Sequence, residues 1–150
     1  MPTHSEHRRM PYTAEQMYAL IEDVEAYPDF LPWCAASRIR KDARGPGGTG
    51  HLDADLVISF KVFRERFGSR VDFDPATRSI NVSYLDGPFK YLVNEWRFTP
   101  DGDGCIVDFH VDFEFKNRTL QMIIGVVFGE AMQRIVRAFE NRAEELYAKV

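Results

Sequence analysis

The sequence contains little cysteine, no long hydrophobic run and no excess of positive charge. Its two cysteines, Cys34 and Cys105, fit no CxxC or zinc-ligand spacing, which favours small buried thiols in a reducing compartment. The longest apolar stretch, Leu120–Phe128, is interrupted by Gln121 and Gly125 and is far shorter than the roughly 18–20 residues that span a membrane. With 19 basic and 23 acidic residues the net charge is −4, so we expect no DNA partner.

The chain also lacks the signals of secretion and of common catalytic chemistry. Segment 1–13 contains no apolar stretch of roughly 7–15 residues, so we expect no secretory signal and a cytoplasmic location. There is no HExxH, GxSxG, Walker A or GxGxxG motif, and the four histidines are scattered. We therefore expect no catalytic residue, no metal site and a binding protein instead of an enzyme.

Aromatic side chains are abundant. The chain has 12 Phe, 6 Tyr and 2 Trp, together 13% of its 150 residues. Such large apolar side chains need a core or a ligand to pack against. The length suits a single domain that buries roughly 68–70% of its unfolded surface. We expect one domain over residues 1–150 with a large apolar interior.

Hydrophobic periodicity predicts the order of the elements. Segment 3–10 predicts an edge strand, and the Thr13/Gln16 capping-box pattern begins a helix that ends at Tyr27-Pro28. Segment 29–33 predicts a second short helical turn or a loop. Strict alternation then predicts strands within segments 36–42, 51–62, 66–73, 80–84, 91–98 and 105–115, and helical spacing predicts one helix over 118–149. This order is typical of an α+β fold, in which a curved antiparallel sheet of about six or seven strands wraps around one long helix.

Such a sheet presents more apolar surface than one helix about 10–12 Å wide can cover. The remaining space is filled by bulky side chains, closed by the small helices or left as a ligand cavity, and the aromatic content is compatible with each. An aromatic-ligand cyclase would need an acid or base inside, and we identify none at the inward positions. The candidate ligand-binding residues are Leu56, Ile58, Phe67, Ser69, Val82, Leu92, Asn94, Trp96, Phe109 and Phe113 from the sheet, Ile123 and Val127 from the long helix, and Phe30, Leu31 and Trp33 as a lid.

Asn94 is the one strongly polar side chain on the inward face of its predicted strand. A buried amide without a partner costs about 1–3 kcal/mol, so Asn94 should be hydrogen-bonded. One interpretation is a core amide bonded to a neighbouring backbone group. The other is a donor that orients a ligand carbonyl, such as a quinone oxygen, with Ser69 as a second polar contact.

The segment Leu120–Phe128 is apolar on all sides of the predicted helix. Such a turn must be covered on its outer side or meet lipid or a partner. The pair Gly125 and Gly129, spaced i, i+4, makes a small face that another surface can approach. The alternatives are close packing on the first helix or on Trp33, and a ligand portal that touches a membrane.

Basic residues cluster in two places despite the net negative charge. Arg38, Arg40, Lys41 and Arg44 precede a glycine-rich loop, and Arg134, Arg137 and Arg142 lie late in the long helix. These clusters are either solvated surface or a local patch that docks on RNA or anionic lipid.

Two sequence blocks, Tyr12–Cys34 and Gly87–Phe98, resemble the coenzyme Q-binding START family, a branch of the polyketide cyclase/START superfamily. The strand Asp112–Phe115 and the helical segment Ala138–Arg142 also fit, so the resemblance spans nearly the whole chain. It implies the helix-grip (START/Bet v 1-like) fold, with two small helices after the first strand.

The resemblance implies a lipid carrier that binds ubiquinone or a related polyprenyl quinone in a hydrophobic cavity and supports respiratory electron transport. Ubiquinone would then be a bound ligand and not a cofactor, and the protein would be peripheral to the inner membrane when Leu120–Phe128 contacts it. A bacterial subgroup with the same blocks is described as ribosome-association toxins, which bind the large ribosomal subunit and hinder subunit joining. The alternative function is therefore a ribosome-directed regulator.

Overall fold

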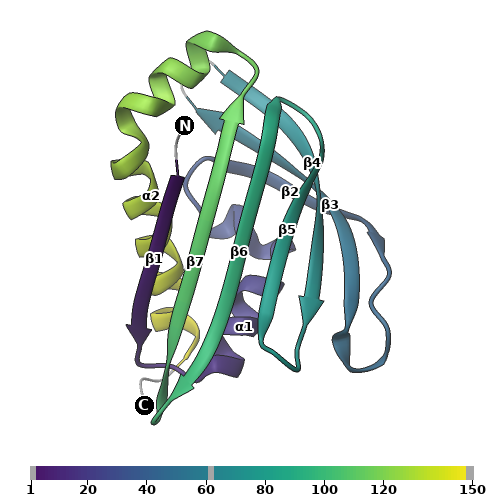
Figure 1. Ribbon diagram of the computed structural model, residues 1–150, viewed down its shortest axis with the longest axis vertical. Coiled ribbons are helices and arrows are strands. Elements are labelled where there is room, and N and C mark those ends of the chain that lie inside the picture. The colour runs from purple at the N-terminus through teal and green to yellow at the C-terminus, as the bar shows by residue number, and fades with distance from the viewer. Residues whose placement is uncertain (1–2, 61–62, 148–150) are drawn as a thin grey trace.

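The elements form the α+β arrangement that the sequence pattern predicts (Figure 1). The computed structural model describes residues 3–60 and 63–147. In chain order the elements are β1 (Thr3–Met10), α1 (Ala14–Glu22), the 3-10 helix η1 (Val24–Asp29), β2 (Cys34–Asp42), the short 3-10 turn η2 (Pro46–Gly48), β3 (Gly50–Phe60), β4 (Phe63–Asp74), β5 (Ser79–Asp86), β6 (Phe89–Asp101), β7 (Gly104–Phe115) and α2 (Arg118–Leu146).

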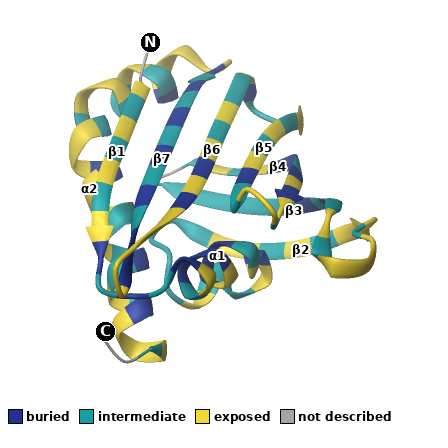
Figure 2. Ribbon diagram, turned by 60° about the horizontal axis from the view of Figure 1, so that its bottom comes forward, coloured by how far each residue is buried: buried dark blue, intermediate teal, exposed yellow. Residues whose placement is uncertain are grey.

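The strands form one seven-stranded antiparallel sheet in the order β1-β7-β6-β5-β4-β3-β2. Consecutive strands from β2 to β7 are neighbours, and β1 closes the order beside β7. The sheet is strongly curved, so that β2 and β3 run nearly across the direction of β6 and β7 (Figure 2). Side chains alternate between the concave and the convex face, as pairs such as Trp96 opposite Phe109 illustrate.

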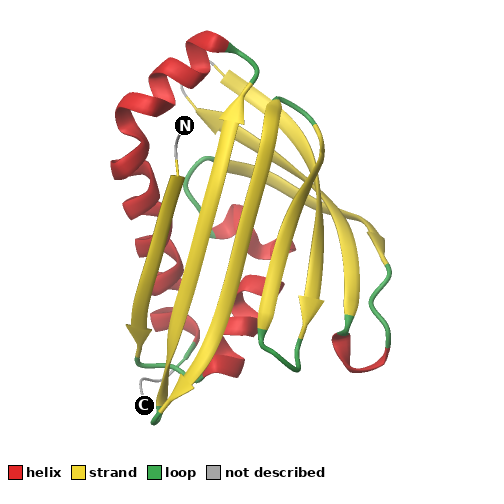
Figure 3. Ribbon diagram, in the orientation of Figure 1, coloured by secondary structure: helices red, strands yellow, loops and turns green. Residues whose placement is uncertain are grey.

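The two α-helices, drawn red in Figure 3 with the short 3-10 helices, each begin at a residue whose side chain caps the helix. The Thr13 hydroxyl accepts a hydrogen bond from the Gln16 backbone N–H (3.1 Å), and the Gln16 side chain accepts one from the Thr13 N–H (3.0 Å), so the predicted capping box is present. Asn117 caps α2 by accepting a bond from the Leu120 N–H (3.0 Å). α1 contacts β6, β7 and α2, and η1 lies against β2.

Some predicted boundaries differ from the structure. The helical run expected to reach Tyr27 splits into α1 and η1, because α1 ends at Glu22 and the chain then tightens into a 3-10 helix that contains Pro28. The strand expected over 51–62 ends at Phe60, and residues 61–62 lie outside the described residues, as does the predicted helix end at Lys149. β4 and β6 begin earlier than the alternation indicated.

The core is most tightly packed at the end of the sheet where α1 lies. Leu52, Ala54 and Cys105 are fully buried there, and the rings of Tyr18 and Phe98 meet edge to face at 5.9 Å. Toward the opposite end, inward residues such as Leu56, Ile58 and Phe60 are only partly buried. The interior is therefore filled at one end of the sheet and hollow toward the other.

Candidate functional site

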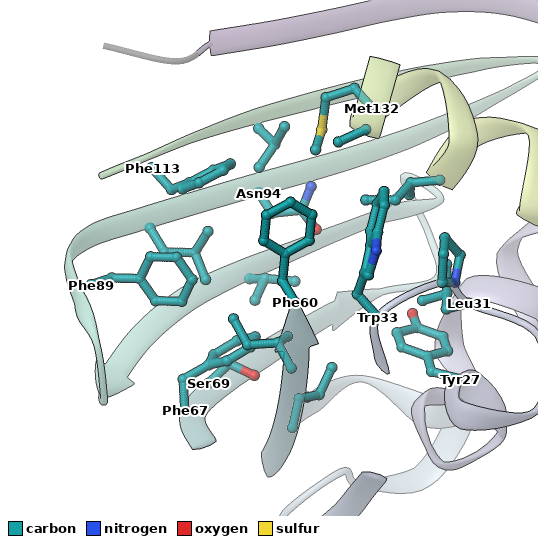
Figure 4. Close-up of a pocket in the computed structure, with 18 of the residues that line it drawn as sticks. Tyr27, Leu31, Trp33, Phe60, Phe67, Ser69, Phe89, Asn94, Phe113 and Met132 are labelled. Atoms are coloured by element: carbon teal, nitrogen blue, oxygen red, sulfur yellow. The ribbon is translucent and has the colours of Figure 1, made fainter. Parts of the chain in front are cut away.

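The concave face of the sheet encloses a cavity of about 280 Å³ (Figure 4). Its wall is built by β3 to β7, by α1 and the segment that follows it, and by the inward side of α2. The lining is almost wholly apolar, and Glu65, Ser69 and Asn94 are its polar side chains apart from the Tyr and Trp rings. Of the three alternatives for the uncovered sheet face, the structure shows a cavity that aromatic rings line without filling it.

Most candidate residues line this cavity, and those on the strands do so because strand alternation places them on the concave face. The residues at the wall are Leu31, Trp33, Leu56, Ile58, Phe67, Ser69, Val82, Leu92, Asn94, Trp96, Phe109 and Phe113. Ligand binding by these residues stays a prediction. Their shared position in one cavity is a feature of the structure.

Three candidate residues do not line the cavity. Phe30 lies behind the wall, where its ring meets that of Phe139 at 5.4 Å and the Arg142 guanidinium stacks on it. Ile123 and Val127 are partly exposed on another side of α2. Because the start of this helix is apolar all round, its sequence pattern could not indicate which side faces inward. The residues of α2 that do so are Leu120, Ile124, Ala131, Met132, Ile135 and Phe139.

Asn94 makes two hydrogen bonds within the protein. Its amide nitrogen donates to the His110 carbonyl oxygen (3.0 Å), and its amide oxygen accepts from the Trp96 indole nitrogen (2.9 Å). The core-amide interpretation therefore accounts for one donor and one acceptor of this side chain. The second amide hydrogen is what a ligand carbonyl could use, and that contact remains a prediction.

Glu65 is an inward residue that the sequence analysis missed. It lies on β4 between Phe63 and Phe67, which also line the cavity, and it stands opposite Ile58 of β3. The expectation that no inward position carries an acid is therefore wrong. The sequence does indicate this position: residues two apart in a strand share a face, and Glu65 is two residues before the inward residue Phe67.

Aromatic side chains surround the partly exposed end of the cavity. Trp33, which precedes β2 and has a positive φ of 64°, packs edge to face on Phe60 with ring centroids 5.8 Å apart. Figure 4 shows these two rings side by side in front of Asn94. On the adjoining wall the Tyr27 hydroxyl donates to the Ile21 carbonyl, and desolvation of this hydroxyl raises the pKa of Tyr27, so the phenol stays neutral.

The first half of α2 is exposed on the side away from the cavity. Met122 and Val126 are 69% and 83% exposed. A Cβ added to Gly125 or Gly129 would meet nothing within 4 Å. Close packing of these glycines on the first helix or on Trp33 is therefore wrong, and the apolar outer side of this turn is open to solvent.

The convex face of the sheet carries a network of ion pairs. Arg66 bonds to Asp55 (2.6 Å) and Asp86 (2.8 Å), Arg40 pairs with the same Asp55 (3.1 Å), and Arg70 bonds to Asp53 (2.8 Å). Of the predicted cluster before the glycine loop, Arg40 and Arg44 are thus paired, the latter with Asp42 and Glu22. Within residues 3–60 and 63–147, Arg38 and Lys41 are exposed and have no ion pair.

In the part of the chain that the structure describes, no cluster of three or more His, Cys, Asp or Glu side chains could hold a metal ion. None of the helices there has the length and apolar content to cross a membrane.

The curved sheet, the long C-terminal helix and the apolar cavity between them define the helix-grip class, which includes START-like and Bet v 1-like proteins. A family model for "Polyketide cyclase / dehydrase and lipid transport" matches residues 10–140. The chain belongs to this family.

The relatives fall into two groups by name, ribosome association toxins and a coenzyme Q-binding protein. The chain is 39% identical over 149 residues to the ribosome association toxin RatA of Escherichia coli K12, covering 99% of this chain and 90% of that protein. It is 32% identical to the coenzyme Q-binding protein COQ10 homolog B, mitochondrial, of Xenopus laevis, covering 97% of this chain and 59% of that protein. The solution structure of the 18 kDa protein CC1736 from Caulobacter crescentus has a TM-score of 0.79 at 39% identity, covering 97% and 98% of the two chains.

Replacement of Asn94 by alanine should lower the free energy of unfolding by about 1–3 kcal/mol, because it leaves the buried Trp96 indole N–H without a partner. Urea denaturation followed by circular dichroism measures the loss. In a Trp96→Phe background, which has no indole N–H, the same substitution should cost less. Equal costs in both backgrounds would show that the Asn94–Trp96 bond contributes nothing.

Proposed function

We propose that this protein is a carrier that binds a polyprenyl quinone, such as ubiquinone, or a similar amphiphile in the cavity under α2. The supporting observation is the cavity itself, whose wall is apolar apart from a few polar groups. Burial of apolar ligand surface contributes about 25 cal/mol per Å² to the free energy of binding, less the cost of association, so such a wall favours an apolar ligand. The polar side chains would orient its head group.

The size of the cavity bears on how such a ligand would sit. About 280 Å³ is near the lower end of the roughly 300–1,000 Å³ range of small-molecule sites. The cavity would hold a ring and the first part of a tail, and a longer polyprenyl tail would leave through the end lined by Trp33, Phe60 and Ile124. The relative named as a coenzyme Q-binding protein supports a quinone head group. A carrier of such a quinone would support respiratory electron transport.

Replacement of Val82 by tryptophan tests whether the cavity is the binding site. Val82 lines the cavity from β5, so the larger side chain should fill it and weaken binding at least about tenfold. The matched control is Val93→Trp, because Val93 is 43% exposed and does not line the cavity. Binding of a short-tailed ubiquinone is measured by quenching of tryptophan fluorescence, and native mass spectrometry of the purified protein checks for a co-purifying quinone. Unchanged binding by a folded Val82→Trp protein would refute the proposal.

The carrier would load and unload at a membrane through the first half of α2. Leu120 and Ile124 of this segment line the cavity, while Met122 and Val126 on the same turns are exposed. The segment is thus apolar toward both the ligand and the outside, as a portal that touches lipid would need to be. This contact would place the protein at the surface of the inner membrane during transfer.

The double substitution Met122→Ser and Val126→Ser should slow quinone transfer between vesicles several-fold, because it removes exposed apolar surface without changing the cavity wall. Quinone affinity in detergent-free solution should stay the same. Leu146→Ser is the control, since Leu146 is an exposed apolar residue near the other end of α2. Equal transfer rates for the wild type and the double variant would rule out this portal.

The second candidate function is association with the large ribosomal subunit, and the relative named as a ribosome association toxin favours it. Binding to ribosomal RNA needs cations that are not already neutralised by carboxylates. Arg38 and Lys41 of β2 meet this condition among the described residues, whereas Arg40 pairs with Asp55.

Charge reversal of Arg38 and Lys41 to glutamate should abolish co-sedimentation with large ribosomal subunits if this function holds. Binding by the wild type should fall steeply with salt, because phosphate contacts release counterions. The cavity variant Val82→Trp should sediment like the wild type. If the charge-reversed protein still co-sediments, the strand β2 is not the contact, and if the wild type does not, the carrier function is favoured.

A further inference from the structure

The polar side chains of the cavity wall differ in charge, because Glu65 carries a carboxyl group whereas Ser69 and Asn94 are neutral. Among the described residues Glu65 is the only lining side chain with an ionisable carboxyl group, and no ion pair or hydrogen bond of its side chain is found there. Its neighbours on the inward face are Phe63 and Phe67 on β4 and Ile58 directly opposite on β3. The carboxylate therefore stands in an apolar part of the wall.

Nearby arginines of the same strand cannot neutralise this carboxylate. Arg64 and Arg66 flank Glu65 in sequence, so strand alternation directs both to the convex face. The Arg66 guanidinium is already bonded to Asp55 and Asp86 on that face. Among residues 3–60 and 63–147 no side chain donates a hydrogen bond to Glu65 on the inward side, where water or the molecule in the cavity can supply one.

A carboxylate accepts hydrogen bonds and donates none. A quinone carbonyl, an ether or an ester oxygen is also only an acceptor, so it gains nothing at Glu65 and displaces the water that solvates it. A hydroxyl group donates to the carboxylate in a charge-assisted bond, which is roughly twice as strong as a neutral one. An anionic head group such as a fatty acid carboxylate would be repelled.

We propose that Glu65 makes the cavity selective for ligands with a hydroxyl head group, that is, for a hydroquinone over its quinone and for a polyprenyl alcohol over its ester. This inference rests on the proposed carrier function and specifies its ligand. Glu65 is a specificity-determining residue in this scheme. The apolar wall supplies affinity for the tail, and the carboxylate favours head groups that donate a hydrogen bond over those that only accept one.

The test compares matched pairs of probes on the wild-type protein and on Glu65→Gln. The pairs are a short-tailed ubiquinone with its hydroquinone, kept reduced under anaerobic conditions, and geranylgeraniol with its acetate. Trp33 and Trp96 line the cavity, so their fluorescence reports the dissociation constants. Glu95→Gln is the control, because Glu95 is an exposed carboxylate on β6 outside the cavity.

The wild type should bind the hydroxyl member of each pair roughly tenfold tighter, which is what one additional charge-assisted bond provides. Glu65→Gln is nearly isosteric but its amide can donate to a carbonyl, so the preference should vanish or reverse. Glu95→Gln should keep it. Equal affinities within each pair for the wild type, or a preference that survives in Glu65→Gln, would overturn the selectivity while leaving the carrier function intact. If no probe binds the wild type, both proposals fail.

Discussion

A seven-stranded sheet that curls around one helix has more inward apolar surface than the helix can contact. At one end of the sheet, α1 and the aromatic rings of Tyr18 and Phe98 cover the inward surface that the long helix does not contact. Toward the other end none of the described elements does so, and the cavity is what remains. The hollow therefore follows from the sheet's width and curvature together with the side chains around it, which leave the space unfilled and determine what it can hold.

The polar side chains of Asn94 and Glu65 in this wall have different roles. Asn94 is tied to Trp96 and to the backbone of β7, so it joins neighbouring strands and fixes the orientation of an indole in the wall. Glu65 has no comparable anchor among the described residues. The contrast separates a polar residue that stabilises the sheet from one whose interactions depend on what enters the cavity.

Strand alternation predicts many of the sheet residues on the cavity wall, because a period of two fixes the face of each residue in a regular strand once one inward residue is known. It fails across an irregularity such as the register shift between Phe89 and Tyr91 in β6. The same alternation applies to Glu65, but this residue precedes the segment 66–73 over which the sequence predicts a strand, and β4 begins at Phe63. The helix was harder. Its first turns are apolar on every side, so Ile123 and Val127 were chosen where Ile124 faces inward. Phe30 was misplaced because loop residues have no period, and the partners of Arg40 and Asn94 depend on contacts between distant strands.

Carboxylate–guanidinium pairs join β3, β4 and β5 on the convex face, while the concave face of the same strands forms part of the cavity wall. Because successive residues alternate between these faces, a substitution at an inward position leaves the outer network untouched. At inward positions that make no hydrogen bonds within the sheet, unlike Asn94, the lining can therefore be changed without removing the ion pairs that join the strands on the outer face. At those positions the residues that contact a ligand and the residues that hold the strands together can be altered separately.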